Sequence, residues 1–311
     1  GLNPTIQVGA KLKQLNGNYL VGDKKYLVLE SCEYVESFLK FHPTAEIILN
    51  IDNDHLDYFK NFENVKSAFR KFTNLLPEDG ILVINADDKS CLELKNNNSI
   101  TYGLNNKEAD FYANNIKFDD NGFAEFDVYC KGEFFYKFKL NVPGIHNVSN
   151  ALACIALCYK FNISKNDMYN ALIKFTGADR RFEYIGKCNG AHVFDDYAHH
   201  PTEIKATVNA MKNKKYNESW VIFQSHTYSR TYNLLNEFAE VLSNFDNIIV
   251  TDIYSAREEN TYNVYPEQIV EKIKGKKAMF ISGYDNVVKY VKDKIKPEDR
   301  VITVGAGPVV E

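Results

Sequence analysis

Short apolar runs alternate with helical periodicities along the first part of the chain. Residues 25–30 and 45–50 have the length and composition of strands, and residues 64–76 repeat apolar side chains at helical spacing. The run at 81–85 is continuously apolar, as in strands buried inside a parallel sheet. This alternation predicts an α/β domain built on a mostly parallel sheet.

The pattern changes between residues 99 and 142, where several strand-like runs follow one another without helices. Asp120, Asn121 and Gly122 form a turn signal between two of these runs. We therefore expect an antiparallel appendage on the sheet. The segment 143–160 then combines a glycine turn with a helix that is apolar on nearly every side, which predicts a buried helix.

Strands and helices alternate regularly through the last part of the chain. Strand-like runs lie at 191–196, 220–224, 247–251, 278–282 and 301–305. This pattern predicts a Rossmann-like doubly wound sheet, whose sites lie at the carboxyl ends of its strands. A length of 311 residues suits two domains. We place the boundary at about Thr176, giving domains 1–176 and 177–311.

Composition narrows the class of protein. With 45% hydrophobic and 25% charged residues, the chain is typical of folded globular proteins. Its net charge of −4 offers no basic surface for a nucleic acid backbone. The six cysteines are scattered and indicate free thiols, and no signal sequence or apolar run of about 18 residues occurs. We expect a cytoplasmic protein that does not insert into membranes.

Acids and a histidine follow two predicted strands of the first domain, which suggests a metal site there. His55 lies between acids in the segment 50–59, directly after one strand, and Glu30 ends another. If these are neighbouring parallel strands, Glu30 lies close to His55, and the pair could bind a hard cation such as Mg²⁺. The alternative is a surface histidine and a solvated glutamate.

The glycine turn before the buried helix carries a second polar group. His146, Asn147 and Asn150 fall near the helix N-terminus, where backbone N–H groups and amides can contact a base or a phosphate. Helix capping explains one asparagine but not all three residues.

Two consecutive strand ends in the second domain are densely polar. The segment DDYAHHP (195–201) holds two acids, a tyrosine and two histidines, too many for a helix cap alone. After the next strand, His226, Tyr228 and Arg230 reach the same sheet edge. A guanidinium there suits a phosphate or a carboxylate, because it forms bidentate charged hydrogen bonds.

The remaining arginine and glycine segments do not identify a ligand by themselves. Arg180 and Arg181 lie at the domain boundary, where they could form an interdomain salt bridge or contact a phosphate. The segment 301–309 does not complete G-x-G-x-x-G, which disfavours a dehydrogenase, and no Walker motif G-x-x-x-x-G-K-[ST] occurs.

Taken together and in order, these motifs resemble those of the Mur ligases across nearly the whole chain. The segments are ESCEY (30–34), NIDNDHLD (50–57), PGIHNVSNA (143–151), GADRRFE (177–183), DDYAHHPTE (195–203), HTYSRT (226–231) and GAGP (305–308). The resemblance implies a central ATPase domain followed by a Rossmann-like C-terminal domain. It also implies that ATP phosphorylates the lactyl carboxylate of UDP-N-acetylmuramate, and that the amine of L-alanine attacks the acyl phosphate. The protein then mainly positions the reactants and neutralises charge.

Residue roles follow from the same resemblance. Glu30 and His55 would hold Mg²⁺. The adenine side of the nucleotide would be contacted by Asn147, with His146 and Asn150. Arg181 and Asp196 would reach ATP from the C-terminal domain. The muramyl substrate and the acyl phosphate would be faced by Tyr197, His199 and Arg230, with His226 a weaker candidate.

Two family features are missing from this sequence, the N-terminal UDP-binding domain and the P-loop. We therefore expect a fragment of a longer enzyme that is inactive alone. Two alternatives stay open at this point. The murein tripeptide ligase of cell-wall recycling shares most of these motifs, and a nucleotide-binding relic would never have had a P-loop.

Overall fold

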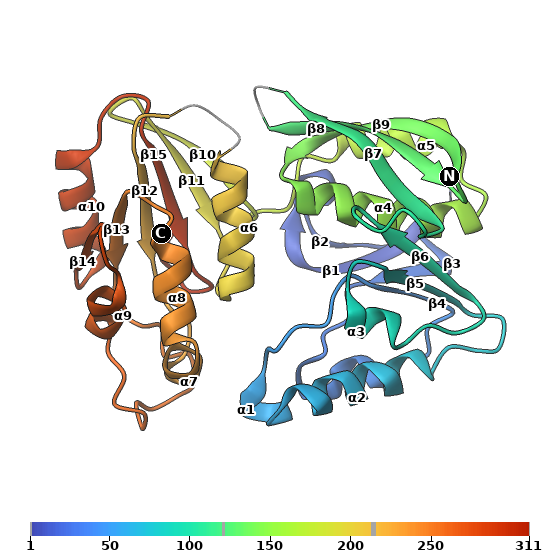
Figure 1. Ribbon diagram of the computed structural model, residues 1–311, viewed down its shortest axis with the longest axis horizontal. Helices are drawn as coiled ribbons and strands as arrows, with labels where there is room; N and C mark the ends of the chain where they lie inside the picture. Colours follow the sequence, from blue (N-terminus) through green and yellow to red (C-terminus); the bar gives the residue numbers. More distant parts are fainter. Residues whose placement is uncertain (1, 120–121, 213–215, 311) are drawn as a thin grey trace. The chain divides into compact units, whose positions relative to one another are not determined.

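A computed structural model describes residues 2–119, 122–212 and 216–310. The chain divides into two compact units, Gly1–Thr176 (unit 1) and Gly177–Glu311 (unit 2), both drawn in Figure 1. Each unit carries its own sheets and hydrophobic cores. Among the described residues, no helix is both long and apolar enough to span a membrane.

The main sheet of unit 1 has six strands. They run in the order β4 (Ala45–Ile48), β5 (Ile81–Asn85), β6 (Ser99–Gly103), β7 (Phe111–Phe118), β8 (Phe123–Cys130) and β9 (Glu133–Pro143). The pairs from β4 to β7 are parallel and those from β7 to β9 antiparallel, which confirms a mostly parallel sheet with an antiparallel appendage. Two residues of the expected turn, Asp120 and Asn121, lie outside the described residues.

Alternate residues of the central strand β5 enter cores on opposite faces of this sheet. Leu82 and Ile84 pack in a cluster with the 3₁₀ segment η2 (Tyr34–Lys40) and helix α2 (Phe62–Thr73). Val83 faces the cluster built with α4 (Ile145–Lys160) and α5 (Lys165–Lys174). Two short helices, α1 (Leu56–Phe59) and α3 (Lys89–Leu92), complete this part.

The predicted burial of α4 holds for one side of the helix but not for its outer side. Its inner side is buried in the core, but Cys154 and Tyr159 are exposed. An apolar residue type does not decide burial by itself, because single apolar side chains are common at protein surfaces.

A separate three-stranded sheet was not expected from the sequence. It has the order β2 (Gly17–Leu20), β1 (Pro4–Leu12) and β3 (Asp23–Leu29), with the short 3₁₀ turn η1 (Lys13–Leu15) between β1 and β2. Strand β3 pairs in parallel with β1 and does not belong to the sheet of β4. The expectation that Glu30 and His55 follow neighbouring strands is therefore wrong, because β1 takes up the hydrogen bonds of β3.

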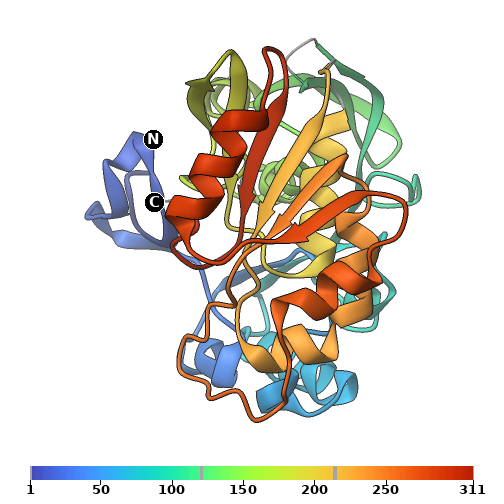
Figure 2. The same cartoon turned by 90° about the vertical axis from the view of Figure 1, so that its left-hand side faces the viewer.

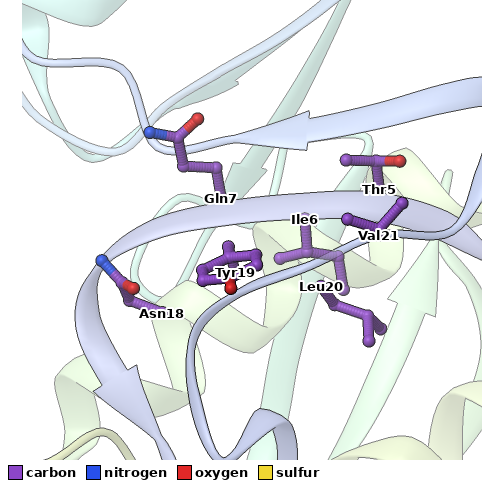
Figure 3. Close-up of a pocket in the computed structure, with 7 residues that line it drawn as sticks. All are labelled: Thr5, Ile6, Gln7, Asn18, Tyr19, Leu20 and Val21. Atoms are coloured by element: carbon purple, nitrogen blue, oxygen red, sulfur yellow. The ribbon is translucent and has the colours of Figure 1, made fainter.

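This small sheet exposes apolar side chains. Tyr19 and Val21 are 68% and 77% exposed. Around them lies a shallow hollow (Figure 3), lined by Thr5, Ile6, Gln7, Asn18, Tyr19, Leu20 and Val21. A strand whose apolar residues face solvent lacks the clean alternation that marks a half-buried strand in a sequence.

Unit 2 contains one six-stranded sheet. Its order is β10 (Glu183–Cys188), β11 (Ala191–Asp196), β15 (Arg300–Val304), β12 (Ser219–Phe223), β13 (Asn247–Val250) and β14 (Lys277–Phe280). All pairs are parallel except β10 with β11, which is antiparallel. Strand β10 was not expected, because it begins in the polar segment 176–184.

Helices cover both faces of this sheet, as in the predicted doubly wound fold. One core includes α6 (Pro201–Lys212), α8 (Leu235–Leu242) and α9 (Pro266–Lys272). Helix α10 (Tyr284–Lys294), drawn in red in front of the sheet in Figure 2, packs on the opposite face. The short helix α7 (Tyr228–Asn233) lies between β12 and α8 in the chain.

One side chain in the core of unit 1 is an acid. Glu46, on the edge strand β4, is 4% exposed, and neither carboxylate oxygen has a hydrogen-bond partner among the described residues. Burial raises the pKa of this carboxyl to about 8, from an ordinary value of 4.5. The folded state thus favours the protonated form, and its stability falls as pH rises from about 4.5 towards 8.

We expect Glu46→Gln to stabilise unit 1 at pH 8 by on the order of 4 kcal/mol, with little effect at pH 4.5. The neutral amide has the shape of the protonated acid and does not ionise. Urea-dependent proteolysis of unit 1 at the two pH values measures the difference. Glu78→Gln, at an exposed position, is the control. Equal effects of Glu46→Gln at both pH values would contradict the interpretation.

Candidate active site

The candidate site in unit 2 lies where several parallel strands end together. Val304 of β15 pairs with Asp196 of β11 on one side and with Phe223 of β12 on the other. Strand β13 ends level with them, since Val250 lies opposite Phe223. The loops that leave β11, β12 and β13 therefore start from one edge of the sheet, where open α/β sheets bind ligands.

A row of four rings spans these three loops. The ring centroids of Tyr197 and His199 are 5.5 Å apart, those of His199 and His226 are 5.8 Å apart, and those of His226 and Tyr254 are 5.6 Å apart. Tyr197 and Tyr254, at the two ends, are 37% and 40% exposed. The row thus offers an open surface of aromatic and imidazole groups. Tyr254 was missed by the sequence analysis.

Arg230 lies beside this row because of the fold of the loop after β12. Its Nη1 is 3.0 Å from His226 Nδ1 and 3.4 Å from the carbonyl oxygen of His226. Arg230 sits in α7, and the hydroxyl of Thr227 accepts a hydrogen bond from its backbone N–H at 3.4 Å. The structure therefore brings together four of the predicted residues, which are Tyr197, His199, His226 and Arg230.

Glu203 on α6 fixes the loop that carries His199. Its carboxylate accepts hydrogen bonds from the backbone N–H groups of His199 at 2.9 Å and His200 at 3.2 Å. The Nδ1 atom of His199 lies 3.4 Å from the same carboxylate and 3.1 Å from the carbonyl oxygen of Tyr197. The acid in the first turn of α6 thus orients the imidazole from one side.

Asp196 lies beneath the loop and is 7% exposed. One carboxylate oxygen accepts a hydrogen bond from the backbone N–H of Ala198 at 3.1 Å, and the other from the hydroxyl of Thr207 at 2.6 Å. Burial nevertheless raises the pKa of Asp196 to about 6. Both oxygens have partners inside unit 2, and the assignment of Asp196 to ATP stays a prediction.

The two arginines of the segment GADRRFE have different surroundings. Arg180 donates from Nε to Asp195 at 2.8 Å, and from Nη2 to the carbonyl oxygens of Gly305 at 2.8 Å and Gly307 at 3.0 Å. Asp195 is completely buried. The Arg181 side chain is 51% exposed and 3.7 Å from Glu203, so it can reach a ligand. These contacts of Arg180 lie within unit 2, unlike the interdomain bridge considered above.

The glycine turn after β15 packs against the same loops. A Cβ at Gly307 would come within 2.2 Å of the Gln224 side-chain oxygen and 2.9 Å of the Tyr254 ring. A side chain at this position would displace one or both residues. The G-A-G segment therefore lets the backbone after β15 approach Gln224 and Tyr254 closely.

In unit 1, the two residues predicted to bind metal have other partners. Glu30 accepts a hydrogen bond from the backbone N–H of Gly9 at 2.7 Å. His55 Nε2 lies 3.3 Å from Glu33 and 3.8 Å from Asp54, and the hydrogen bond from His55 lowers the pKa of Glu33. Among the described residues, no group of three or more histidines, cysteines or acids could hold a metal ion. Glu30 and His55 thus have separate partners, and their assignment to Mg²⁺ stays a prediction.

The asparagines at the start of α4 contact their own turn. Asn147 Nδ2 donates to the carbonyl oxygen of Pro143 at 2.8 Å, and Asn150 Nδ2 to Asn147 Oδ1 at 3.4 Å. Gly144, at the N-cap, has a φ of +98°, a backbone conformation that residues other than glycine rarely adopt. His146 is exposed on the first turn. A nucleotide contact by these three residues stays a prediction.

Comparison with protein families assigns almost the whole chain. Residues 3–158 match the Mur ligase middle domain, and residues 180–307 match the Mur ligase, glutamate ligase domain. The chain belongs to the Mur ligase family. Its Mur ligase motifs lie in both matched regions.

Named relatives agree with this assignment. The chain is 47% identical to a UDP-N-acetylmuramate–L-alanine ligase of Acetivibrio thermocellus over 99% of this chain and 67% of that protein. It is 46% identical to the protein of the same name from Clostridium beijerinckii, over 99% of this chain and 68% of that one. This Mur ligase chain thus spans about two thirds of the length of these curated relatives.

Solved structures share the fold of this Mur ligase. The UDP-N-acetylmuramate–alanine ligase of Thermotoga maritima superimposes with a TM-score of 0.82 at 29% identity, covering 99% of this chain and 67% of that one. A murein peptide ligase of Psychrobacter arcticus has a TM-score of 0.68 at 22% identity, covering 98% and 69%. The second likeness shows the fold alone.

We expect Arg180→Met to destabilise unit 2 by on the order of 3 kcal/mol, because it leaves the buried carboxylate of Asp195 without its cationic partner. Trp220, the single tryptophan, is buried in unit 2 and reports its unfolding by fluorescence in urea. Arg181→Met, at the exposed neighbour, should change stability by less than about 1 kcal/mol. Similar effects of the two substitutions would argue against the role given to Arg180.

Proposed function

We propose that this chain forms part of an ATP-dependent ligase that joins L-alanine to UDP-N-acetylmuramate during synthesis of peptidoglycan precursors. The observation that carries the proposal is 47% identity over 99% of the chain to a ligase of that name. The cationic and aromatic group at the sheet edge of unit 2 supports it, because this chemistry suits an anionic sugar derivative. ATP would phosphorylate the lactyl carboxylate, giving ADP and an acyl phosphate. The amine of L-alanine would then attack the acyl carbon, forming the amide and releasing phosphate.

The residues of unit 2 would bind the muramyl end and stabilise the negative charge that develops there. The Arg230 guanidinium can donate two parallel hydrogen bonds to a carboxylate or an acyl phosphate. His199 is oriented by Glu203, so that its ring keeps a fixed direction beside His226, which contacts Arg230. The exposed ring of Tyr197 would pack against the substrate. Such fixed groups lower the barrier by positioning and by charge stabilisation.

On family resemblance, each unit has its own predicted nucleotide contacts. In unit 1 these are His146, Asn147 and Asn150, and in unit 2 they are Arg181 and Asp196. Unit 1 would then be the ATP-binding domain and unit 2 the substrate domain. For Mg²⁺, Glu30 and His55 remain predicted ligands on family resemblance, and we derive no step through the ion.

In the natural-length enzyme, Arg230→Lys should lower turnover by about a hundredfold, because the ammonium replaces a planar donor pair with a point charge. The assay is phosphate release that requires UDP-N-acetylmuramate, L-alanine and ATP together. Arg257→Lys, on an exposed loop, is the matched control. Near-normal turnover of Arg230→Lys would remove Arg230 from the site. Activity with a murein tripeptide in place of L-alanine would favour the recycling ligase.

The 311-residue chain should bind Mg·ATP at least about a hundredfold more weakly than the natural-length enzyme, and be inactive alone. Its sequence holds no Walker motif, whose backbone N–H groups and lysine would bind the phosphates. Titration calorimetry of both proteins measures the ratio. Micromolar affinity of the 311-residue chain would contradict this expectation.

A further inference from the structure

The loop after β13 is joined to the loop that carries His226 and Arg230. The backbone N–H of Tyr254 donates to the carbonyl oxygen of Ser225 at 2.9 Å, and the N–H of Thr227 donates to the carbonyl oxygen of Tyr254, also at 2.9 Å. These bonds form an isolated parallel bridge between His226 and Tyr254. The two loops therefore extend the pairing of β12 and β13 beyond the ends of the strands.

Glu258, in the loop after β13, binds the start of α7. Glu258 accepts two hydrogen bonds from Ser229, from the backbone N–H at 2.8 Å and from the hydroxyl at 2.5 Å. Ser229 is 8% exposed and directly precedes Arg230. Its hydroxyl is also 3.2 Å from that of Thr227, which caps the backbone N–H of Arg230. Glu258 thus acts on the turn from which the Arg230 side chain starts.

This turn has an unfavourable backbone conformation. Thr227 has a φ of +68° and a ψ of 148°, a region that β-branched residues rarely adopt. Such a conformation is strained and persists only where surrounding contacts fix it. Tyr254 contributes backbone hydrogen bonds here, and the backbone N–H and hydroxyl of Thr231 both donate to the carbonyl oxygen of Thr227. The bonds from Ser229 to Glu258 are the side-chain support from the loop after β13. Removal of the carboxylate should let this turn relax.

We propose that Glu258 is a positioning residue for Arg230. Its carboxylate holds Ser229, and through Ser229 it sets the direction in which the guanidinium leaves α7 towards His226 and the bound anion. This inference rests on the proposed function, since Arg230 is assigned to the acyl phosphate there. A shift of about 1 Å in such a group can lower the rate by about a hundredfold.

The test uses the natural-length enzyme with Glu258→Gln, and Glu259→Gln as the matched control. Glu259 is the next residue and its side chain is exposed. We expect Glu258→Gln to lower kcat between about tenfold and about a hundredfold, while KM for ATP changes less than about threefold. Hydrogen exchange of the amides at 228–234 should become faster, with the strands of unit 2 unchanged. Glu259→Gln should match the wild type in all three measurements.

A double-mutant cycle shows whether Glu258 acts through Ser229. After Ser229→Ala, the added loss from Glu258→Gln should be smaller than in the wild-type background, because the two residues share one interaction. Fully additive losses would overturn the proposal. So would a kcat for Glu258→Gln within about twofold of the control, or a general loss of stability seen at Trp220. A wild-type enzyme without ligase activity would contradict the proposed function. Unchanged hydrogen exchange of the amides at 228–234 would separately overturn the proposal that Glu258 holds the turn through Ser229.

Discussion

The site edge of unit 2 depends on the ion pair between Arg180 and the buried Asp195. The guanidinium binds the end of β11 through this carboxylate and the turn after β15 through two glycine carbonyl oxygens. That turn packs against Gln224 and Tyr254. The Arg180 guanidinium therefore also supports the loops after β12 and β13. Removal of the cation would leave the buried charge of Asp195 uncompensated, which is strongly destabilising. Arg180 therefore acts in this unit as part of the scaffold, while its neighbour Arg181 remains accessible.

The functional groups of unit 2 are held by acids that lie outside the ring row. Glu203 fixes the His199 loop from α6, Glu258 fixes the start of α7, and Asp196 fixes the loop after β11 through Ala198 and Thr207. Each of these acids accepts hydrogen bonds from backbone or hydroxyl donors nearby. The cationic groups can thus face an anionic ligand without a carboxylate filling the same position. This separation suits a site that must stabilise negative charge.

The sequence predicted the regular elements well where apolar runs are continuous. Strands β5 and β11 have the predicted bounds, because both are buried and their residues leave no ambiguity of length. Strand β2 was missed because Tyr19 and Leu20 face solvent, and β10 because it begins among charged residues. Strand β1 was missed although its apolar side chains alternate with more exposed positions. Pairing partners were harder still. Nothing local in KYLVLE reveals that β3 pairs with β1, so the inferred closeness of Glu30 and His55 failed with that pairing.

The candidate site was only partly predictable for a related reason. Motifs name the residues that meet a ligand, and the sheet edge does bring His199, His226 and Arg230 together. The residues that orient them are Glu203, Tyr254 and Glu258. Two of these, Tyr254 and Glu258, lie up to 29 positions along the chain from the residues that they contact, across the strand β13. Their effect requires β12 and β13 to be adjacent and to end level, which is a property of the folded sheet. A loop sequence alone does not specify this, since a serine, a glutamate and a tyrosine in surface segments are common in any globular protein. The geometry of the turn at Thr227 is what distinguishes them, because a strained β-branched residue there requires external support, and the loop after β13 supplies it.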